Sequence, residues 1–470
     1  MKLRNYVRGA WTESASTLWH DVYNPSSEQV VAQVPESTEA EIDDAVAAAR
    51  DAAEGWAAVT FEERQESLAK IKAALDSRRA DLVQAVMDDV GTPRRIADAV
   101  QVGVPGRIID ALLDLKAEDC EPVVKLGNST VIHEPVGVVA AITPWNYPLY
   151  MVISKVMPAL LAGNTVVLKP SEITPIAVDL LVQCIDAAGL PAGVFNLIHG
   201  TGPSVGEALV AHRGVDMVSF TGSTAAGKRV SKVASETLKR VHTELGGKGP
   251  HILLPDADLE SSVKAAVGNC YLNSGQTCLA LTRLLVHEAQ YEQAVELAAA
   301  AAERFTVGAP DDPATKLGPM VSAEHKARVQ RMIRDGITEG ARVAAGGPED
   351  ADVEVGYFVR PTVLADVTSG MSVAQEEIFG PVLVVLSYRD EDDAVRIAND
   401  TIYGLSAGVR SADPDKALSV ARRIKAGQVE VNGGAYNPAA PFGGYKQSGN
   451  GRELGRFGVR EFYEIKSIQA

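Results

Sequence analysis

Cysteine is scarce in this chain, with four residues among 470, which is too few for a disulfide framework. The four thiols are Cys120, Cys184, Cys270 and Cys278. Seven residues separate Cys270 from Cys278, and no histidine or third cysteine lies close by, so this pair does not have zinc-site spacing. We therefore expect no bound metal, and each cysteine has to be explained as a free thiol in a reducing compartment.

The chain also lacks a long hydrophobic run and an excess of basic residues. Its longest apolar stretches, residues 137–142 and 156–168, are too short or too interrupted to span a bilayer. The net charge of −16 repels phosphate backbones and anionic lipid, which argues against nucleic acid and membranes as partners. Lys2 and Arg4 precede no apolar segment, so the N-terminus does not resemble a signal peptide. We expect a cytoplasmic protein that acts on a small molecule.

Hydrophobic periodicity indicates an α/β protein with more than one domain. Residues 39–79 carry apolar side chains at three- and four-residue steps between charges, as amphipathic helices do. After Val136, short β-rich segments alternate with helical ones, which is typical of βαβ units and a parallel sheet. A second α/β series starts near Gly249. Residues 121–135 and 457–470 alternate as edge strands do, so they are open to pairing with another subunit.

Three segments at predicted strand ends are candidate dinucleotide contacts. Gly200–Gly206 follows a strand, but it has one residue too many between its second and third glycine for a Rossmann fingerprint. Ser223 opens a predicted helix, where free N–H groups bind phosphate. Lys169 can hold a ribose hydroxyl, and Glu172 would accept a hydrogen bond from the 2′-hydroxyl and repel a 2′-phosphate. A plain turn or helix cap explains each segment singly; together they favour NAD over NADP.

Cys278, in the stretch NSGQTCLA, is the candidate nucleophile. A cysteine nucleophile needs a thiolate, donors that hold the oxyanion it creates and usually a base. The side-chain amide of Asn146 can join the backbone N–H of Cys278 as such a donor. Glu244 precedes two glycines at the end of a β-like run, where a carboxylate can serve as the base. Taken singly, a local turn contact suits Asn146 and a solvated surface position suits Glu244 at least as well.

Seven motifs, in this order along the chain, resemble those of the NAD(P)-dependent aldehyde dehydrogenase superfamily. They are ITPWNYP, LKPSE, FTGST, ELGGK, GQTC, EEIFGPV and PFGGYKQSGNGRE, and they extend over nearly the whole chain. The resemblance implies an α/β fold with a Rossmann-variant cofactor domain in residues 1–112 and 137–246 and a second α/β catalytic domain in 247–447. It also implies a β oligomerisation arm in residues 113–136 and 448–470, and hence a homodimer or homotetramer.

The resemblance implies a role for each motif residue. Cys278 would be the nucleophile, Asn146 the oxyanion donor and Glu244 the general base, with Lys155 and Glu453 as secondary candidates near the site. The implied cofactor contacts are Trp145, Lys169, Glu172, Ser223, Glu377 and Phe379. The implied aldehyde tunnel is lined by Tyr147, Met151, Ser154, Thr277, Leu279, Tyr436 and Phe442.

The implied reaction is NAD-dependent oxidation of an aldehyde to a carboxylic acid. Cys278 attacks the aldehyde, the thiohemiacetal collapses with hydride transfer, and water activated by Glu244 hydrolyses the thioester. The apolar and aromatic tunnel residues favour a medium aliphatic or aromatic aldehyde. A semialdehyde or betaine aldehyde is the alternative substrate, although no arginine falls at the mapped tunnel positions. A cofactor-independent thiol amidohydrolase would use a similar cysteine and glutamate, but it would not need the LKPSE and FTGST segments.

Overall fold

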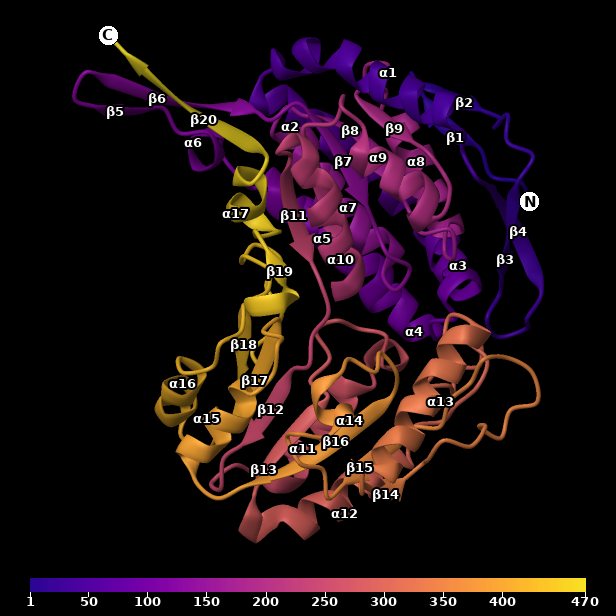
Figure 1. Ribbon diagram of the computed structural model, residues 1–470, viewed down its shortest axis with the longest axis vertical. Coiled ribbons are helices and arrows are strands. Elements are labelled where there is room, and N and C mark those ends of the chain that lie inside the picture. Colours follow the sequence, from indigo (N-terminus) through magenta and orange to yellow (C-terminus); the bar gives the residue numbers. More distant parts are fainter.

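The structure, a computed structural model, describes residues 1–470 and contains two large sheets, one in each lobe of the molecule (Figure 1). The first sheet has eight strands in the order β19-β11-β10-β7-β8-β9-β1-β2. The five neighbours from β11 to β9 are parallel, and β19, β1 and β2 are antiparallel additions at the two edges. The strand bounds are β1 (Asn5–Val7), β2 (Ala10–Thr12), β7 (Val138–Ile142), β8 (Thr165–Lys169), β9 (Phe195–Leu197), β10 (Met217–Thr221), β11 (Arg240–Glu244) and β19 (Gly449–Asn450).

The second sheet has seven strands in the order β14-β15-β16-β13-β12-β17-β18. All neighbours are parallel except β14 and β15. The bounds are β12 (Pro250–Leu253), β13 (Arg283–His287), β14 (Arg342–Ala345), β15 (Thr362–Ala365), β16 (Val382–Tyr388), β17 (Ser406–Arg410) and β18 (Gln428–Val431). The alternation of strands and helices after Val136, and the second α/β series, are therefore confirmed.

Helices cover both faces of each sheet. The predicted helices in residues 39–79 are confirmed as α1 (Glu39–Ala57) and α2 (Phe61–Ser77), each opened by a threonine–glutamate capping box. The other helices of the first lobe are α3 (Arg79–Val90), α4 (Arg94–Ile96), α5 (Gly103–Leu113), α6 (Ala117–Cys120), α7 (Pro148–Leu161), α8 (Ile176–Ala187), α9 (Glu207–Ala211), α10 (Thr224–Ala234) and α17 (Gly455–Arg460). Those of the second lobe are α11 (Leu259–Cys270), α12 (Tyr291–Ala302), α13 (Ala323–Thr338), α14 (Ser372–Gln375), α15 (Glu391–Asn399) and α16 (Pro414–Ala421).

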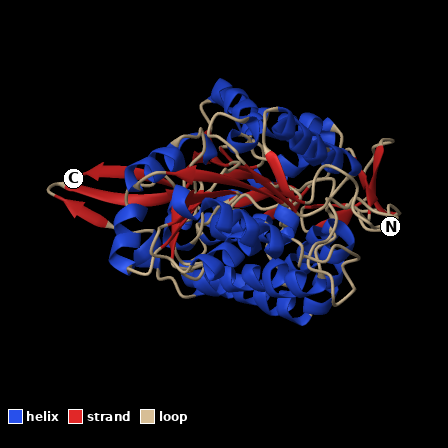
Figure 2. Cartoon of the chain, turned by 90° about the horizontal axis from the view of Figure 1, so that it is seen from below, coloured by secondary structure: helices blue, strands red, loops and turns tan.

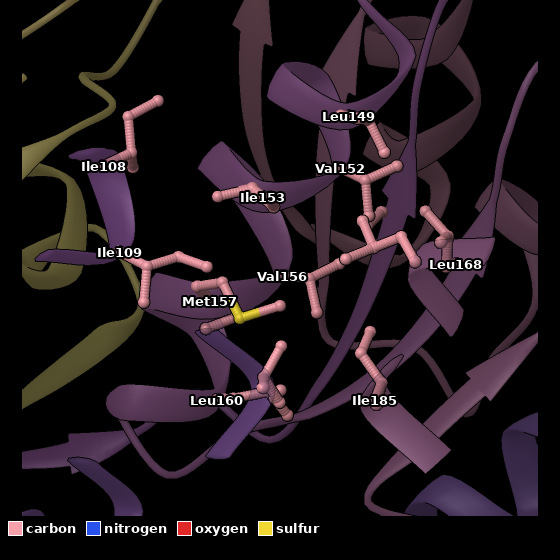
Figure 3. Packing of buried hydrophobic residues seen from close by; sticks show 14 of the residues in the cluster. Ile108, Ile109, Leu149, Val152, Ile153, Val156, Met157, Leu160, Leu168 and Ile185 are labelled. Atoms are coloured by element: carbon pink, nitrogen blue, oxygen red, sulfur yellow. The ribbon is translucent and has the colours of Figure 1, made fainter. Parts of the chain in front are cut away.

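Helix α7 is the buried centre of the first lobe. Figure 3 shows its side chains packing against Ile108 and Ile109 of α5, Leu168 of β8 and Ile185 of α8. Every residue of α7 except Tyr150 is buried, so the helix cannot shift without disturbing the core. The rigid helix fixes the residues on it and the turn that precedes it.

A narrow antiparallel sheet projects from the first lobe (Figures 1 and 2). It has the order β20-β6-β5, with bounds β5 (Val124–Leu126), β6 (Ser129–Pro135) and β20 (Tyr463–Gln469). The expectation of a strand over 457–470 is wrong for its first part, because residues 457–460 belong to α17 and pack between α5, α6 and α7. A two-stranded hairpin of β3 (Trp19–Tyr23) and β4 (Val30–Pro35) completes the fold. No helix has both the length and the apolar character to cross a membrane. The domain boundaries stay predictions.

Candidate active site

The carboxyl ends of parallel strands gather the predicted residues at one edge of the first sheet. Strands β7, β8, β10 and β11 pair in parallel register and end at Ile142, Lys169, Thr221 and Glu244. Asn146 follows the first of these ends and Ser223 the third. In open α/β sheets this edge is where ligands bind.

The loop that carries Cys278 has an unusual backbone. Asn273, Ser274 and Gly275 all have positive φ, at 53°, 57° and 74°. Such conformations cost energy for residues other than glycine and persist only where the surroundings enforce them. Here the Ser274 hydroxyl donates to the Gly318 carbonyl at 2.9 Å, and Gly275 abuts the backbone of Gly380 too closely for any side chain. The loop is therefore held in one shape just before the thiol.

Asn146 is tied directly to this loop. Its side-chain Nδ2 donates to the Gln276 carbonyl at 3.0 Å, and its own carbonyl accepts from Gln101 Nε2 at 2.9 Å and Asn273 Nδ2 at 3.1 Å. Thr92 donates to Asn273 Oδ1 at 2.7 Å and completes the network. An amide nitrogen carries two hydrogens, so one hydrogen of Asn146 remains for a ligand. Sequence reasoning missed Thr92, Gln101 and Asn273, because no local pattern links them to the nucleophile.

The thiol of Cys278 lies in an environment that keeps it protonated at rest. Burial raises its pKa, and the nearby carboxyls of Glu377, Glu244 and Glu453 raise it further, while the backbone N–H of Leu279 acts in the opposite sense. The other three thiols are buried, whereas Cys278 is partly exposed. Cys278 is thus the thiol that a ligand can reach, and it has to lose its proton before it can act as a nucleophile.

Glu244 is buried, with 3% of its residue surface exposed, and neither carboxyl oxygen has a hydrogen-bond partner. Burial raises its pKa well above the usual range, and the neighbouring Glu453 adds to the rise, while Lys155 and Arg452 oppose it. Lys155 Nζ donates to Glu453 Oε1 at 2.5 Å inside the protein. The sequence-based alternative of a solvated surface glutamate is therefore wrong for Glu244. A buried carboxyl without partners is a candidate acid or base.

Aromatic side chains line the approach to the thiol. Thr277 donates to the Leu272 carbonyl at 3.1 Å, so the 2.8 Å contact with Tyr147 has the tyrosine hydroxyl as donor. Tyr150 and Tyr436 join their hydroxyls at 2.9 Å, and the ring of Tyr150 meets Phe442 edge-on at 6.2 Å. Sequence reasoning missed Tyr150, although it lies between two predicted tunnel residues.

Arg107 of α5 lies near the outer end of this aromatic group. Burial raises the pKa of Tyr436, and the positive charge of Arg107 acts against that rise. Arg107 itself is exposed. No arginine lies at the tunnel positions mapped from the sequence, whereas the fold brings Arg107 near Tyr436 from a helix remote in the chain.

The predicted cofactor residues come from both lobes, after β8 and β10 of the first sheet and between α14 and β16 of the second lobe. Lys169 Nζ donates to Glu172 Oε2 at 3.1 Å, and Ser223 caps α10 by accepting from the Ala226 N–H at 3.2 Å.

Glu377 Oε1 accepts from the Gly247 N–H at 2.9 Å, and burial raises the Glu377 pKa to about 7. The ring of Trp145 meets Phe379 edge-on at 5.3 Å. A Cβ atom at Gly246 would lie 2.4 Å from Glu377 Oε2, so a larger residue there would displace this carboxyl.

Helix α13 clamps the backbone of the segment that carries Glu377 and Phe379. Arg328 donates to the carbonyls of Ile378 and Glu377, each at 2.8 Å. His325 Nε2 lies 2.7 Å from the Phe379 carbonyl. Phe379 has a φ of 62°, and these contacts hold it in that unfavourable conformation. Neither Arg328 nor His325 was found from the sequence, where both look like charges on an amphipathic helix.

The model of the Aldehyde dehydrogenase family matches residues 11–468. This chain belongs to the aldehyde dehydrogenase family. Its relatives include a 3-succinoylsemialdehyde-pyridine dehydrogenase from a Pseudomonas species, 44% identical over 98% of this chain and 97% of the relative. Aldehyde dehydrogenases are oxidoreductases that act on aldehydes, so the predicted enzyme class and the predicted resemblance are confirmed.

Solved structures of aldehyde dehydrogenases share the fold. A mutant of aldehyde dehydrogenase C from Pseudomonas syringae, complexed with NAD⁺ and octanal, matches with a TM-score of 0.96 at 44% identity, over 99% of this chain and 96% of that one. A point mutant of betaine aldehyde dehydrogenase from Staphylococcus aureus, in complex with NAD⁺, matches with a TM-score of 0.96 at 36% identity, over 99% and 95%. The predicted fold class, with its Rossmann-like and catalytic α/β parts, is confirmed.

Proposed function

We propose that this aldehyde dehydrogenase oxidises an aldehyde to a carboxylic acid through a thioester on Cys278, with NAD as the hydride acceptor. The supporting observation is the meeting of three groups at one sheet edge. A partly exposed thiol, an amide hydrogen of Asn146 and the unpartnered buried carboxyl of Glu244 all lie there. Each group supplies one requirement of acyl transfer: nucleophile, oxyanion donor and base.

The residues at the edge suit a dinucleotide. The free N–H groups at the start of α10, behind Ser223, suit a pyrophosphate. The ion pair of Lys169 and Glu172 offers a donor and an acceptor to ribose hydroxyls, and the negative charge of Glu172 disfavours the 2′-phosphate of NADP. Glu377 and the Trp145–Phe379 pair would hold the nicotinamide ribose and ring. Bound NAD would supply the hydride acceptor of the reaction.

In the acylation half, the Cys278 thiol loses its proton to solvent, and the thiolate Sγ attacks the aldehyde carbon and forms a thiohemiacetal. The developing oxyanion takes the remaining amide hydrogen of Asn146 and the backbone N–H of Cys278. The network through Asn273 and Gln101 keeps that amide in place, so no reorganisation is needed as charge develops. Loss of hydride from the same carbon leaves a thioester on Cys278.

In the hydrolytic half, the carboxylate form of Glu244 removes a proton from a water molecule that attacks the thioester carbonyl. The thiolate of Cys278 leaves, and the carboxylic acid is released. Transfer of the acyl group to coenzyme A would not need this carboxyl. The retention of a buried glutamate at the end of β11 therefore favours hydrolysis.

The tunnel supports a medium aliphatic or aromatic aldehyde as substrate. Tyr147, Met151, Thr277, Leu279 and Phe442 offer apolar and aromatic contacts close to Cys278, and the complex of the Pseudomonas syringae relative holds octanal. Ser154 is buried in α7, where its hydroxyl donates to the Met151 carbonyl at 3.4 Å, rather than being a free tunnel residue. The outer end, with the Tyr150–Tyr436 hydroxyls and Arg107, can also hold an acceptor or anionic group, which supports a semialdehyde as the second candidate.

The test is to follow NADH absorbance with purified protein, NAD or NADP, and a panel of aliphatic, aromatic, ω-carboxy and quaternary-ammonium aldehydes. We expect NADH and a stoichiometric carboxylic acid without coenzyme A, with kcat/KM highest for C6–C10 aliphatic or aromatic aldehydes and lower with NADP. If the ω-carboxy aldehydes have the highest kcat/KM instead, Arg107 becomes the candidate residue for substrate specificity. Ester or amide turnover without NAD, together with no NADH from any aldehyde, would favour the thiol amidohydrolase reading.

Replacing Arg328 by glutamine should raise the KM for NAD about tenfold and leave kcat within about threefold. The guanidinium makes two charge-assisted hydrogen bonds to the segment that presents Glu377, each worth about 1.5–3 kcal/mol in general. Part of this energy is recovered by water or by the glutamine amide. Steady-state kinetics and NAD titration by tryptophan fluorescence measure the effect. Arg331→Gln, an exposed position on the same helix, is the matched control and should change neither constant.

We further propose that β5, β6 and β20 pair with another copy of the chain in a homodimer or homotetramer. The supporting observation is the apolar surface on these strands, where Leu126 and Ile465 have 62% and 70% of their surface exposed. The cytoplasmic location stays a prediction from the sequence.

A further inference from the structure

His242 lies beside the proposed base. It precedes Glu244 by two residues on β11, so both side chains point to the same face of the sheet. Its Nε2 atom is 3.5 Å from Glu244 Oε1, and the exposed fractions of the two side chains are 2% and 3%. Neither ring nitrogen of His242 and neither carboxyl oxygen of Glu244 has a hydrogen-bond partner. Two buried polar groups thus face each other, just short of forming a hydrogen bond.

The C-terminal segment packs closely against His242 and Glu244. A Cβ atom at Gly451 would lie 2.5 Å from His242 Cδ2, and one at Gly443 would lie 2.8 Å from Glu244 Oε1. On the adjacent strand β10, the register partner of His242 is Ser219, whose buried hydroxyl has no hydrogen-bond partner. The charged groups that face the pair from α7, the segment after β19 and the end of α17 are Lys155, Arg452, Glu453 and Glu461.

These surroundings fix the resting protonation of both groups. Burial lowers the pKa of His242 to about 4, while Glu453 opposes this and Lys155 and Arg452 add to it. His242 is therefore a neutral imidazole at neutral pH, and the raised pKa of Glu244 favours the protonated form of its carboxyl. A protonated carboxyl cannot take a proton from water. It must first become a carboxylate, and a buried carboxylate requires a hydrogen-bond donor.

We propose that His242 is a positioning residue for the base: its Nε2 holds the carboxyl of Glu244 in place and stabilises the carboxylate form by a hydrogen bond. A neutral imidazole can do this because it offers either a lone pair or an N–H at Nε2, and so serves the acid and the carboxylate form in turn. No other side chain bonds to Glu244. The inference rests on the proposed function, since it assigns Glu244 to thioester hydrolysis.

The first test titrates Glu244 directly. Infrared difference spectroscopy follows the carboxylic acid C=O band that is lost in Glu244→Gln. In His242→Leu this band should persist to a pH at least one unit higher than in the wild type, and His242→Gln should lie between them because its amide can donate. The matched control is His251→Gln, which replaces another fully buried strand histidine and should leave the band unmoved. An unmoved band in folded His242→Leu and in His242→Gln would overturn the inference.

The second test separates acylation from hydrolysis with 4-nitrophenyl acetate, which acylates a cysteine without a cofactor. The burst of nitrophenolate reports acylation of Cys278, and the steady phase reports release of the acyl group. In His242→Leu the burst rate should stay within twofold, while the steady rate at pH 7 falls about tenfold and its acid limb moves up about one pH unit. Equal losses in both phases, or an unchanged acid limb, contradict the proposal.

The two tests distinguish this inference from the proposed function. If no aldehyde yields NADH but the Glu244 band still shifts with His242, the positioning role stands and the oxidation does not. If aldehydes are oxidised and the band stays in place, the oxidation stands and the positioning role is wrong.

Discussion

Replacing Cys278 by alanine is expected to lower kcat/KM for aldehyde oxidation by at least about 10³-fold, as removal of a covalent nucleophile does elsewhere. No other thiol can take its place. Cys120, Cys184 and Cys270 are buried, and the thiol of Cys270 donates to the Val382 carbonyl at 3.5 Å. Burial raises the Cys270 pKa to about 12, so it stays protonated. NADH formation, with far-ultraviolet circular dichroism to show that the variant is folded, measures the loss.

The matched control for this prediction is Cys270→Ala, which should keep kcat/KM within a few-fold because its thiol contacts only β16, through the Val382 carbonyl. Residual activity above about 1% in Cys278→Ala would contradict the nucleophile assignment. The pH dependence of labelling gives a second measurement. Because the Cys278 pKa is raised in the free enzyme, its thiolate fraction is small at pH 7 and grows as pH rises. Alkylation of Cys278 by iodoacetamide should therefore accelerate about tenfold per pH unit above pH 7.

Replacing Lys155 by methionine is expected to lower the free energy of unfolding by about 3–5 kcal/mol, because it leaves the charge of Glu453 buried without its partner. The Lys155 side chain is fully buried and that of Glu453 is 3% exposed, with Nζ and Oε1 2.5 Å apart. The pair joins α7, the centre of the first lobe, to the segment after β19. Urea unfolding at pH 8, followed by circular dichroism, measures the change in the free energy of unfolding.

The contribution of Glu453 to the free energy of unfolding depends on pH with opposite sign in the wild type and in this variant. Burial raises the Glu453 pKa, but Lys155 and His242 outweigh burial, so the net shift is downward. A lowered carboxyl pKa stabilises the folded wild type above the unfolded pKa, and that stability is lost as pH falls through the folded pKa. Lys155→Met removes the largest effect that opposes burial, so burial outweighs the remaining effect of His242 and the Glu453 pKa rises. The loss of stability should therefore be largest at pH 8 and shrink towards pH 5, where Glu453 becomes neutral.

Two controls test whether the unpaired charge is the cause. The double variant Lys155→Met with Glu453→Leu removes both charges and should recover most of the lost stability. Lys72→Met breaks the partly exposed pairs with Asp76 and Asp110 and should cost less than about 1 kcal/mol. If Lys155→Met unfolds at the same urea concentration as the wild type at pH 8, the pair does not stabilise the fold.

Much of the fold follows from local patterns. The helices of residues 39–79 carry capping boxes and an apolar stripe, both of which are visible in a short window of sequence. Strands β7, β8 and β10 appear as short apolar runs because a parallel strand is buried on both faces: Val139 and Ala141 face one core, while Val138, Ala140 and Ile142 face the other. Residues 457–460 were missed as helix because alternation over so short a stretch fits a strand equally well.

The sequence by itself determined the family and the residue types of the chemistry. Cys278, Asn146 and Glu244 occur in motifs whose order along the chain is specific, and acyl transfer demands a nucleophile, an oxyanion donor and a base of these residue types. The tertiary structure alone decided how these groups behave. Glu244 is buried with a raised pKa, Arg107 lies near Tyr436, Arg328 holds the backbone of Glu377 and Ile378, and Lys155 pairs with a residue 298 positions away. The physical reason is that pKa values, buried ion pairs and clamps depend on burial and on contacts between elements remote in the chain. Periodicity and motifs report only on neighbours within a few residues.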